Sequence, residues 1–165
     1  IEKITGLTAE IKWPNDVVVD GHKVCGILTE MSTEIDYINY VVIGVGINVN
    51  QKVFDEELKE KATSLMIETG APVKRSALIA AVMKHFEKNY ALFMENGDLS
   101  GLQESYNEML VNRGKEVRIL EPGNEYNAHA YGINETGELI VRTQKGEEKH
   151  IFAGEVSVRG IYGYV

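Results

Sequence analysis

The sequence has one cysteine, three prolines and one tryptophan, and it lacks any long apolar run. Cys25 has no second cysteine with which to form a disulfide within the chain, and this suits a reducing compartment. No stretch reaches the roughly 18 to 20 apolar residues that a membrane-spanning helix needs. We therefore expect a protein of the cytoplasm that has no membrane partner.

Paired metal ligands and an excess of positive charge are also missing. The four histidines lie far apart, and no His or Cys pair has the spacing of a transition-metal site. Lysine and arginine total 17 against 25 aspartate and glutamate, giving a formal net charge of -8. This balance argues against a broad nucleic-acid surface, although a local basic cluster could still hold an anion.

The first part of the chain mixes strand and helix patterns. Residues 1–13 have the pattern of the end of a helix, a stop at Gly6 and then a strand. Asp20-Gly21 separates two β-rich runs, and this dipeptide supplies the positive φ angles of a two-residue hairpin turn. Residues 37–50 predict a further strand, whose apolar run through Val45 is typical of a strand covered on both faces.

Helical patterns follow these strands. Residues 55–67 predict a short helical segment, which Gly70 and Pro72 interrupt. Residues 74–95 have apolar side chains at the spacing of one helix face, so we expect an amphipathic helix whose stripe packs in the core. A second helix is predicted after Leu99, with Asp98 or Ser100 as its cap.

The pattern changes to short alternating strands after Gly114. Turn signals at nearly regular spacing separate five of them and predict a small barrel. We therefore expect two domains, residues 1–113 and 114–165. The five predicted strands have the sequences KEVRILE, AHAYGIN, ELIVRTQ, EKHIFAG and EVSVRG.

Two common nucleotide-binding motifs are excluded by the spacing of the glycines. GVGINVN has Val49 where a dinucleotide fingerprint needs its third glycine, and G-x-x-x-x-G-K-S/T is absent, so neither a Rossmann nor a P-loop site is predicted. Gly44 and Gly46 lie at strand spacing, which leaves one face of the backbone open to a flat or bulky group. Asn48, just beyond them, offers an amide at the strand end.

The segment KWPND, Lys12 to Asp16, is a second candidate site. A packed indole in a strand-end turn is the ordinary interpretation of this segment, and a solvated surface position is the ordinary fate of a lysine. If Asp20-Gly21 is the turn, however, Lys12 and Lys23 lie close together. Two cations for phosphate, the Asp16 carboxylate for hydrated magnesium and an open glycine backbone would form a nucleotide site of no standard motif.

These motifs together resemble the biotin protein ligases, the biotin–acetyl-CoA-carboxylase ligases of bacteria. The resemblance rests on KWPND, on Lys23 in GHKVCGILTE, on VVIGVGINVN and on AGEVSVRG, in that order. It implies an α/β (α+β) fold, a mixed sheet with helices in a class II synthetase-like ligase domain, followed by an SH3-like β-barrel. Family members carry a glycine- and arginine-rich biotin loop ahead of this region. We therefore expect a fragment that is inactive alone and exposes apolar side chains at residues 41–43.

The resemblance also implies an activity. Such ligases activate biotin with ATP and Mg²⁺ as biotinyl-5'-AMP and transfer it to a lysine of the biotin carboxyl carrier domain of a carboxylase. The alternative is a bifunctional ligase and biotin-dependent repressor, whose DNA-binding domain would lie outside these residues and which would act as a homodimer. Lipoate ligases share the fold, but KWPND with GVGINVN disfavours that interpretation.

Residue roles follow from the same resemblance. Lys23 matches the family's essential lysine and Lys12 a supporting one, while Trp13 and Pro14 would form a rigid wall that aims the polar side chains into the cleft. Asp16 could hold Mg²⁺ through water. Biotin would contact Gly26, Leu28, Gly44 and Ile47, and the nucleotide would contact Asn15, Asp16, Asn48, Phe54, Glu155 and Arg159.

Overall fold

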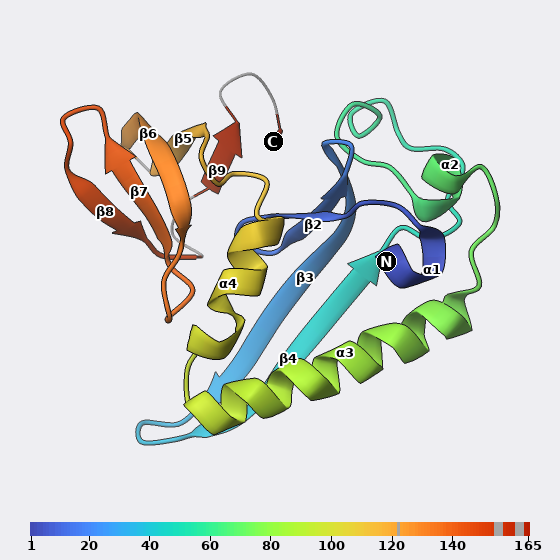
Figure 1. Ribbon diagram of the computed structural model, residues 1–165, viewed down its shortest axis with the longest axis horizontal. Coiled ribbons are helices and arrows are strands. Elements are labelled where there is room, and N and C mark those ends of the chain that lie inside the picture. The colour runs from blue at the N-terminus through green and yellow to red at the C-terminus, as the bar shows by residue number, and fades with distance from the viewer. Residues whose placement is uncertain (122, 154–156, 161–163) are drawn as a thin grey trace.

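The computed structural model describes residues 1–121, 123–153, 157–160 and 164–165, which form two antiparallel sheets and four helices (Figure 1). The α+β class is therefore confirmed. Strand ladders within the described ranges are antiparallel throughout, so the expected mixed sheet is not found there. No helix of the described part is long and apolar enough to cross a membrane.

The first sheet has four strands in the order in which the chain makes them. After the helix α1 (Glu2–Thr5), which ends at Gly6 with a φ of 75°, come β1 (Glu10–Lys12), β2 (Asp16–Val19), β3 (His22–Thr33) and β4 (Ile38–Ile47). Asp20 and Gly21 have φ angles of 47° and 77°, so the predicted β2–β3 hairpin turn is confirmed. This turn brings Lys23 back alongside β2.

Three helices follow, and two of them match the predicted segments. Of the expected helical residues 55–67, residues 56–61 form turns and only 65–67 are helical, as the start of α2 (Leu65–Thr69). Ser64 caps this helix, and its Oγ accepts from the Ile67 backbone N–H at 3.2 Å. Next come α3 (Arg75–Asn96) and α4 (Ser100–Met109). Asp98 accepts a bond from the Ser100 backbone at 2.8 Å, but Leu99 holds the cap position of α4.

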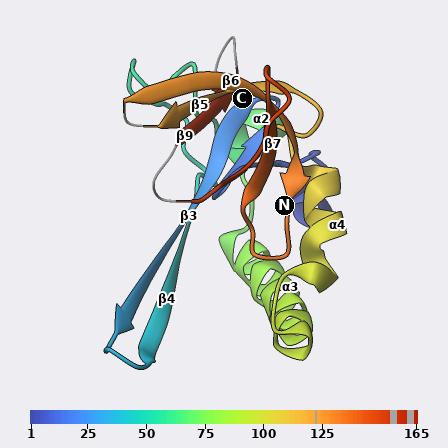
Figure 2. The same cartoon turned by 90° about the vertical axis from the view of Figure 1, so that its left-hand side faces the viewer.

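The apolar stripe of α3 is not in the core, so this expectation was wrong. Leu78 is buried, whereas Phe86, Tyr90 and Phe93 stack on one another and remain partly exposed. Figure 2 gives the reason: the far half of the β3–β4 hairpin diverges from α3.

β4 is likewise uncovered on both faces. Val41 and Val42 are each 50% exposed, Ile43 is 46% exposed and Val45 is 47% exposed. The expectation of a strand covered on both sides was therefore wrong for these residues, and the expectation of exposed apolar side chains at residues 41–43 is confirmed.

The second sheet follows α4 in the chain. Its strand order, β8-β7-β6-β5-β9, leaves β8 and β9 at the edges, and no ladder between described residues closes them into a barrel. The five predicted strands are confirmed. They are β5 (Glu116–Glu121), β6 (Asn124–Ile133), β7 (Leu139–Thr143), β8 (Glu148–Ile151) and β9 (Ser157–Gly160).

Candidate functional site

A hollow of about 500 Å³ lies over β3 and the edge strand β4 of the first sheet. A Cβ on Gly26 would lie 3.0 Å from Lys23 Nζ, so a side chain there would crowd the lysine ammonium and shift it from its present position. At Gly44 and Gly46 the nearest atoms are carbonyl oxygens 3.6 and 3.7 Å away, which leaves the backbone there open. The hollow is lined by Asn15, Asp16, Lys23, Gly26, Ile27, Leu28, Gly44, Val45 and Gly46.

Two charged side chains, Asp16 and Lys23, line this hollow, and Lys12 lies close to both of them. Lys23 Nζ lies 2.5 Å from Asp16 Oδ1, and Lys12 and Asp16 are only 6% and 8% exposed. Burial lowers the pKa of the Lys12 ammonium, the Asp16 carboxylate opposes that shift, and the charges of Lys23 and Arg159 add to it. Two cations with one buried carboxylate leave a net positive centre, which suits a phosphate group.

Tyr164 completes this centre, and no sequence pattern predicted it. Its hydroxyl donates a hydrogen bond to Asp16 Oδ2, and its ring centroid lies 4.3 Å from Lys12 Nζ. Burial first, and then the bond to Asp16, raise the pKa of the Tyr164 hydroxyl, which keeps it a donor. No motif or spacing links residues 148 positions apart, so only the fold reveals the contact.

Trp13 holds the KWPND segment from the other side. It is 1% exposed and belongs to the hydrophobic core of the second sheet, where its Nε1 donates to the Gly137 carbonyl at 3.0 Å. The Tyr106 hydroxyl donates to the Pro14 carbonyl at 3.3 Å. The indole thus anchors the segment to the second sheet.

Three predicted site residues lie away from the hollow. Ile47 packs on the core cluster around Val24, and Phe54 is buried beside a separate hollow of about 330 Å³. Asn48, at the end of β4, donates through Nδ2 to the Thr63 carbonyl at 3.1 Å.

The remaining predicted polar residues are placed as follows. Asn15 is exposed and donates to the Ile27 carbonyl at 2.6 Å, which ties the KWPND segment to β3. Arg159, on β9, pairs in register with Arg118 and has an exposed side chain. Glu155 lies outside the described residues.

A resident metal does not fit the residues described. No group of three or more His, Cys, Asp or Glu side chains among them could hold an ion. Both Asp16 oxygens are already engaged, one by Lys23 and the other by Tyr164.

Burial raises the pKa of the Cys25 thiol, which disfavours a nucleophilic thiolate.

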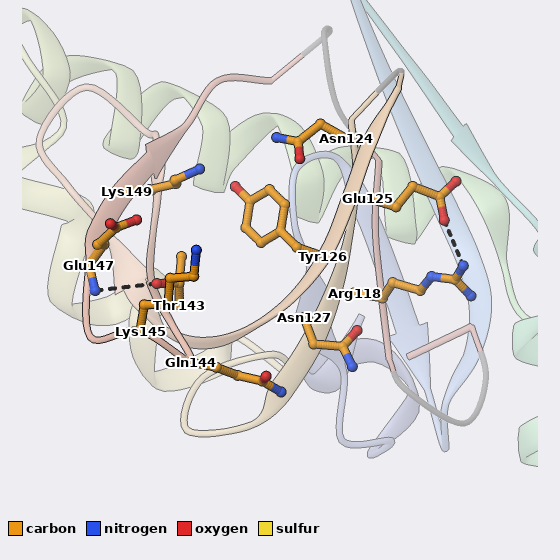
Figure 3. A pocket seen from close by; sticks show the side chains of 10 residues that line it. All are labelled: Arg118, Asn124, Glu125, Tyr126, Asn127, Thr143, Gln144, Lys145, Glu147 and Lys149. Carbon is orange, nitrogen blue, oxygen red and sulfur yellow. Dashed lines mark hydrogen bonds and ion pairs between the residues drawn. The ribbon is translucent and has the colours of Figure 1, made fainter.

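A larger hollow, of about 700 Å³, lies on the second sheet (Figure 3). Its charges are of both signs. Arg118 pairs with Glu125 at 2.6 Å, and Lys149 Nζ lies 4.5 Å from the centroid of the Tyr126 ring. None of its charged side chains is buried, whereas Lys12 and Asp16 beside the first hollow are.

Two family models match the chain. The model described as the Biotin/lipoate A/B protein ligase family matches residues 1–48, which include Lys12, Asp16 and Lys23. The model described as the Biotin protein ligase C terminal domain matches residues 114–159.

Curated relatives extend this match over nearly the whole chain. A Bifunctional ligase/repressor BirA of Bacillus spizizenii is 38% identical over 162 residues, which cover 96% of this chain and 49% of the relative. A biotin–acetyl-CoA-carboxylase ligase of Mycobacterium tuberculosis is 31% identical over 115 residues, 70% of this chain and 40% of the relative. The chain thus spans about half the length of the Bacillus relative.

Comparison with solved structures leads to the same family. The apo structure of biotin protein ligase from Aquifex aeolicus has a TM-score of 0.85 and 32% identity, and the match covers 96% of this chain and 68% of that one. The same ligase in complex with biotin and ATP has a TM-score of 0.82 and 31% identity, with 96% and 65% covered. The chain belongs to the biotin protein ligase family.

Proposed function

We propose that this protein is an ATP-dependent ligase that activates biotin as biotinyl-5'-AMP and transfers the biotinyl group to a lysine of a biotin carboxyl carrier domain. The observation that carries the proposal is the charged centre of buried Lys12 and Asp16 with the partly exposed Lys23, beside an open glycine backbone. The Aquifex ligase described as a complex with biotin and ATP shares this fold at 31% identity, which supports these two substrates.

In the first step, a biotin carboxylate oxygen attacks the α-phosphorus of ATP. A new oxygen–phosphorus bond forms, the bond from the α-phosphorus to the bridging oxygen breaks, and pyrophosphate leaves with that electron pair. Negative charge gathers on the α-phosphate oxygens during the attack. Fixed cations in a water-poor site stabilise such charge best, so Lys23 acts directly on the phosphate and Lys12 supports it.

In the second step, the amine of the carrier lysine attacks the biotinyl carbonyl. An amide bond forms, the bond between the carbonyl carbon and the phosphate oxygen breaks, and AMP leaves with the electron pair. The ammonium proton of the attacking lysine is lost to water. The carrier must therefore reach the same hollow as the adenylate.

The hollow suits the fused ring of biotin. Gly44 and the neighbouring Gly46 leave backbone open, Gly26 makes room for Lys23, and Leu28 adds apolar surface. Ile47 supports the strand from the core side. A compact fused bicycle can lie against such an open strand face.

The nucleotide would extend towards the end of β4. Asn48 donates to the Thr63 carbonyl, so its side-chain oxygen is oriented to accept from the exocyclic amine of adenine. Asn15, Phe54, Glu155 and Arg159 are proposed as further nucleotide contacts. Mg²⁺ enters as part of the MgATP substrate, and Asp16 would meet it through water.

Repression is a second candidate function. The Bacillus relative is named a bifunctional ligase/repressor, and this chain matches about half of it. With a net charge of -8, these residues do not provide the DNA-binding surface. Capture of genomic DNA fragments by the full-length protein as a dimer, only when biotin and ATP are both present, would support this function.

The ligase proposal is tested by pyrophosphate release from the full-length protein. We expect release to require both ATP and biotin, and a carrier domain to gain the mass of one biotinyl group. Lipoate in place of biotin is the control, because one matched family model covers lipoate ligases too. Release without biotin, or equal use of lipoate, would contradict the proposal.

A cytoplasmic location follows from the same proposal, since the carrier is an intracellular enzyme domain.

A further inference from the structure

We propose that Tyr164 is a positioning residue of the adenylation centre, holding the Asp16 carboxylate with its hydroxyl and covering the Lys12 ammonium with its ring. This inference rests on the proposed function, and it assigns a role to a residue that follows the last strand of the second sheet. The site would then be built from both sheets.

The first contact fixes the carboxylate. Asp16 Oδ1 faces Lys23 and Oδ2 accepts the Tyr164 hydroxyl, so each oxygen has its own partner. Without the hydroxyl, the carboxylate could turn towards Lys12, the other cation close by. Both lysines would then be drawn to aspartate and away from a phosphate.

The second contact shields the ammonium. Lys12 Nζ lies 4.3 Å from the Tyr164 ring centroid, and the residue is 6% exposed. The face of a phenol ring attracts a cation while keeping water away from it. Lys12 therefore stays buried and charged without a second carboxylate, which would cancel its effect on an anionic substrate.

The position of Tyr164 is itself fixed by the neighbouring residue. Val165 lies against the β2–β3 turn, where a Cβ on Gly21 would be 3.2 Å from its side chain. Its backbone also contacts Gly160 so closely that a side chain at position 160 would collide with it. Tyr164 is thus held between the hairpin of the first sheet and β9 of the second.

The test compares Tyr164→Phe and Tyr164→Leu in the full-length protein by pyrophosphate release. Phenylalanine keeps the ring and loses the hydroxyl, so we expect a drop in kcat of roughly 10-fold, the value of one hydrogen bond to a charged group. Leucine also loses the ring, and misplacement of both charged partners should lower kcat roughly 100-fold.

A second readout does not depend on activity. Acylation of each lysine by acetic anhydride, followed by mass spectrometry, reports whether its ammonium is shielded. We expect Tyr164→Leu to raise acylation of Lys12 several-fold and Tyr164→Phe to leave it near the wild-type level. Tyr126→Leu is the matched control, since it uncovers Lys149 at a comparable 4.5 Å contact in Figure 3 and should leave Lys12 and kcat unchanged.

The outcomes separate the two proposals. A Tyr164→Leu protein that stays folded with kcat within about twofold of wild type would overturn the positioning role, since misplaced charges should cost far more. Unchanged Lys12 acylation in that variant would overturn the shielding contact. If Tyr164→Leu does not fold, the hydroxyl is still tested by Tyr164→Phe, and unchanged kcat there would overturn its role. If the wild-type protein releases no pyrophosphate, the ligase proposal is wrong. The acylation of Lys12 would still test its contact with the Tyr164 ring.

Discussion

Lys23 has the exposure and the reach that a phosphate ligand needs. Its side chain is 39% exposed, while its partner Asp16 is nearly buried, so the pair presents the ammonium to the hollow and keeps the carboxylate behind it. A buried carboxylate without a cation would be strongly unfavourable, which explains why the lysine is held in place before substrate arrives.

At this residue we predict the largest effect on catalysis. In the full-length protein, Lys23→Ala should lower the rate of pyrophosphate release by about 10²- to 10³-fold, the usual cost of losing one preorganised stabilising group. Lys84→Ala is the control, because this lysine is exposed on α3, away from the hollow. A Lys23→Ala rate within about twofold of wild type would remove Lys23 from the mechanism.

We predict that the buried Lys12 ammonium makes the free energy of unfolding depend on pH. Burial lowers its pKa below the ordinary 10.5, so at pH values between the two the unfolded chain holds a proton that the folded chain has lost. Unfolding then takes up a proton, and stability rises with pH in that window. Relative to Lys12→Met, the wild-type free energy of unfolding should increase as pH approaches 10.5.

Urea unfolding of both proteins at several pH values up to about 10 measures this difference, because an unperturbed lysine loses its proton only above that range. The variant has no proton to lose at position 12. A difference between the two proteins that stays constant with pH would show that the Lys12 ammonium is not destabilised by burial.

The sequence predicted part of the charged centre. Asp20-Gly21 fixed a tight hairpin, and that turn brings Lys23 to Asp16, so three charged residues could be placed from local rules. Tyr164 could not, because its contact depends on how two sheets pack, which no local pattern encodes. Ile47 packs against the core cluster around Val24, so its contact with biotin stays a prediction that alternation along a glycine-containing strand could not decide.

Among the elements, the turn that follows β1 reaches the second sheet through the Trp13 side chain. The Trp13 indole lies in the core formed by β5 to β9, although the residue belongs to the first sheet's turn. The sequence predicted a rigid aromatic here but gave no partner for it.

We predict that Trp13→Ala lowers the free energy of unfolding by about 3–5 kcal/mol, as for other large aromatic side chains removed from a core. Trp13→Phe should cost less, because it keeps an aromatic ring in the core and loses the hydrogen bond to Gly137. Urea denaturation provides both values. Equal stability of wild type and Trp13→Ala would mean that the indole does not hold the sheets together.

The helices show what the spacing of apolar side chains can predict and what it cannot. The spacing of apolar side chains located α3 within a residue at each end, because it reports one face of a helix. It could not say what that face packs against. In the described structure α3 contacts α1 and α4, and most of its stripe stays exposed.

At the scale of the whole molecule, the exposed apolar surface is the feature that most favours self-association in water. β4 exposes valine and isoleucine on both faces, and the α3 stripe adds aromatic rings. Folded proteins seldom leave contiguous apolar patches of this kind in water without a partner.

We therefore predict that the 165-residue chain self-associates. Sedimentation velocity should show a mass that rises with protein concentration, and replacing two exposed β4 residues, Val42→Lys with Ile43→Lys, should reduce the association by adding charge to both faces. Lys149→Glu, on the second sheet, is the control for a change of charge alone. A monodisperse monomer at all concentrations would contradict this prediction.

The central claim is that a biotin carboxylate oxygen attacks the α-phosphorus in this hollow, and isotope transfer tests it most directly. Biotin labelled with oxygen-18 in both carboxylate positions is given to the full-length protein with ATP and a carrier domain, and the AMP is analysed by mass spectrometry. The account predicts that AMP gains one oxygen-18 atom while the other remains in the biotinyl amide. Unlabelled AMP, formed together with biotinylated carrier, would contradict it.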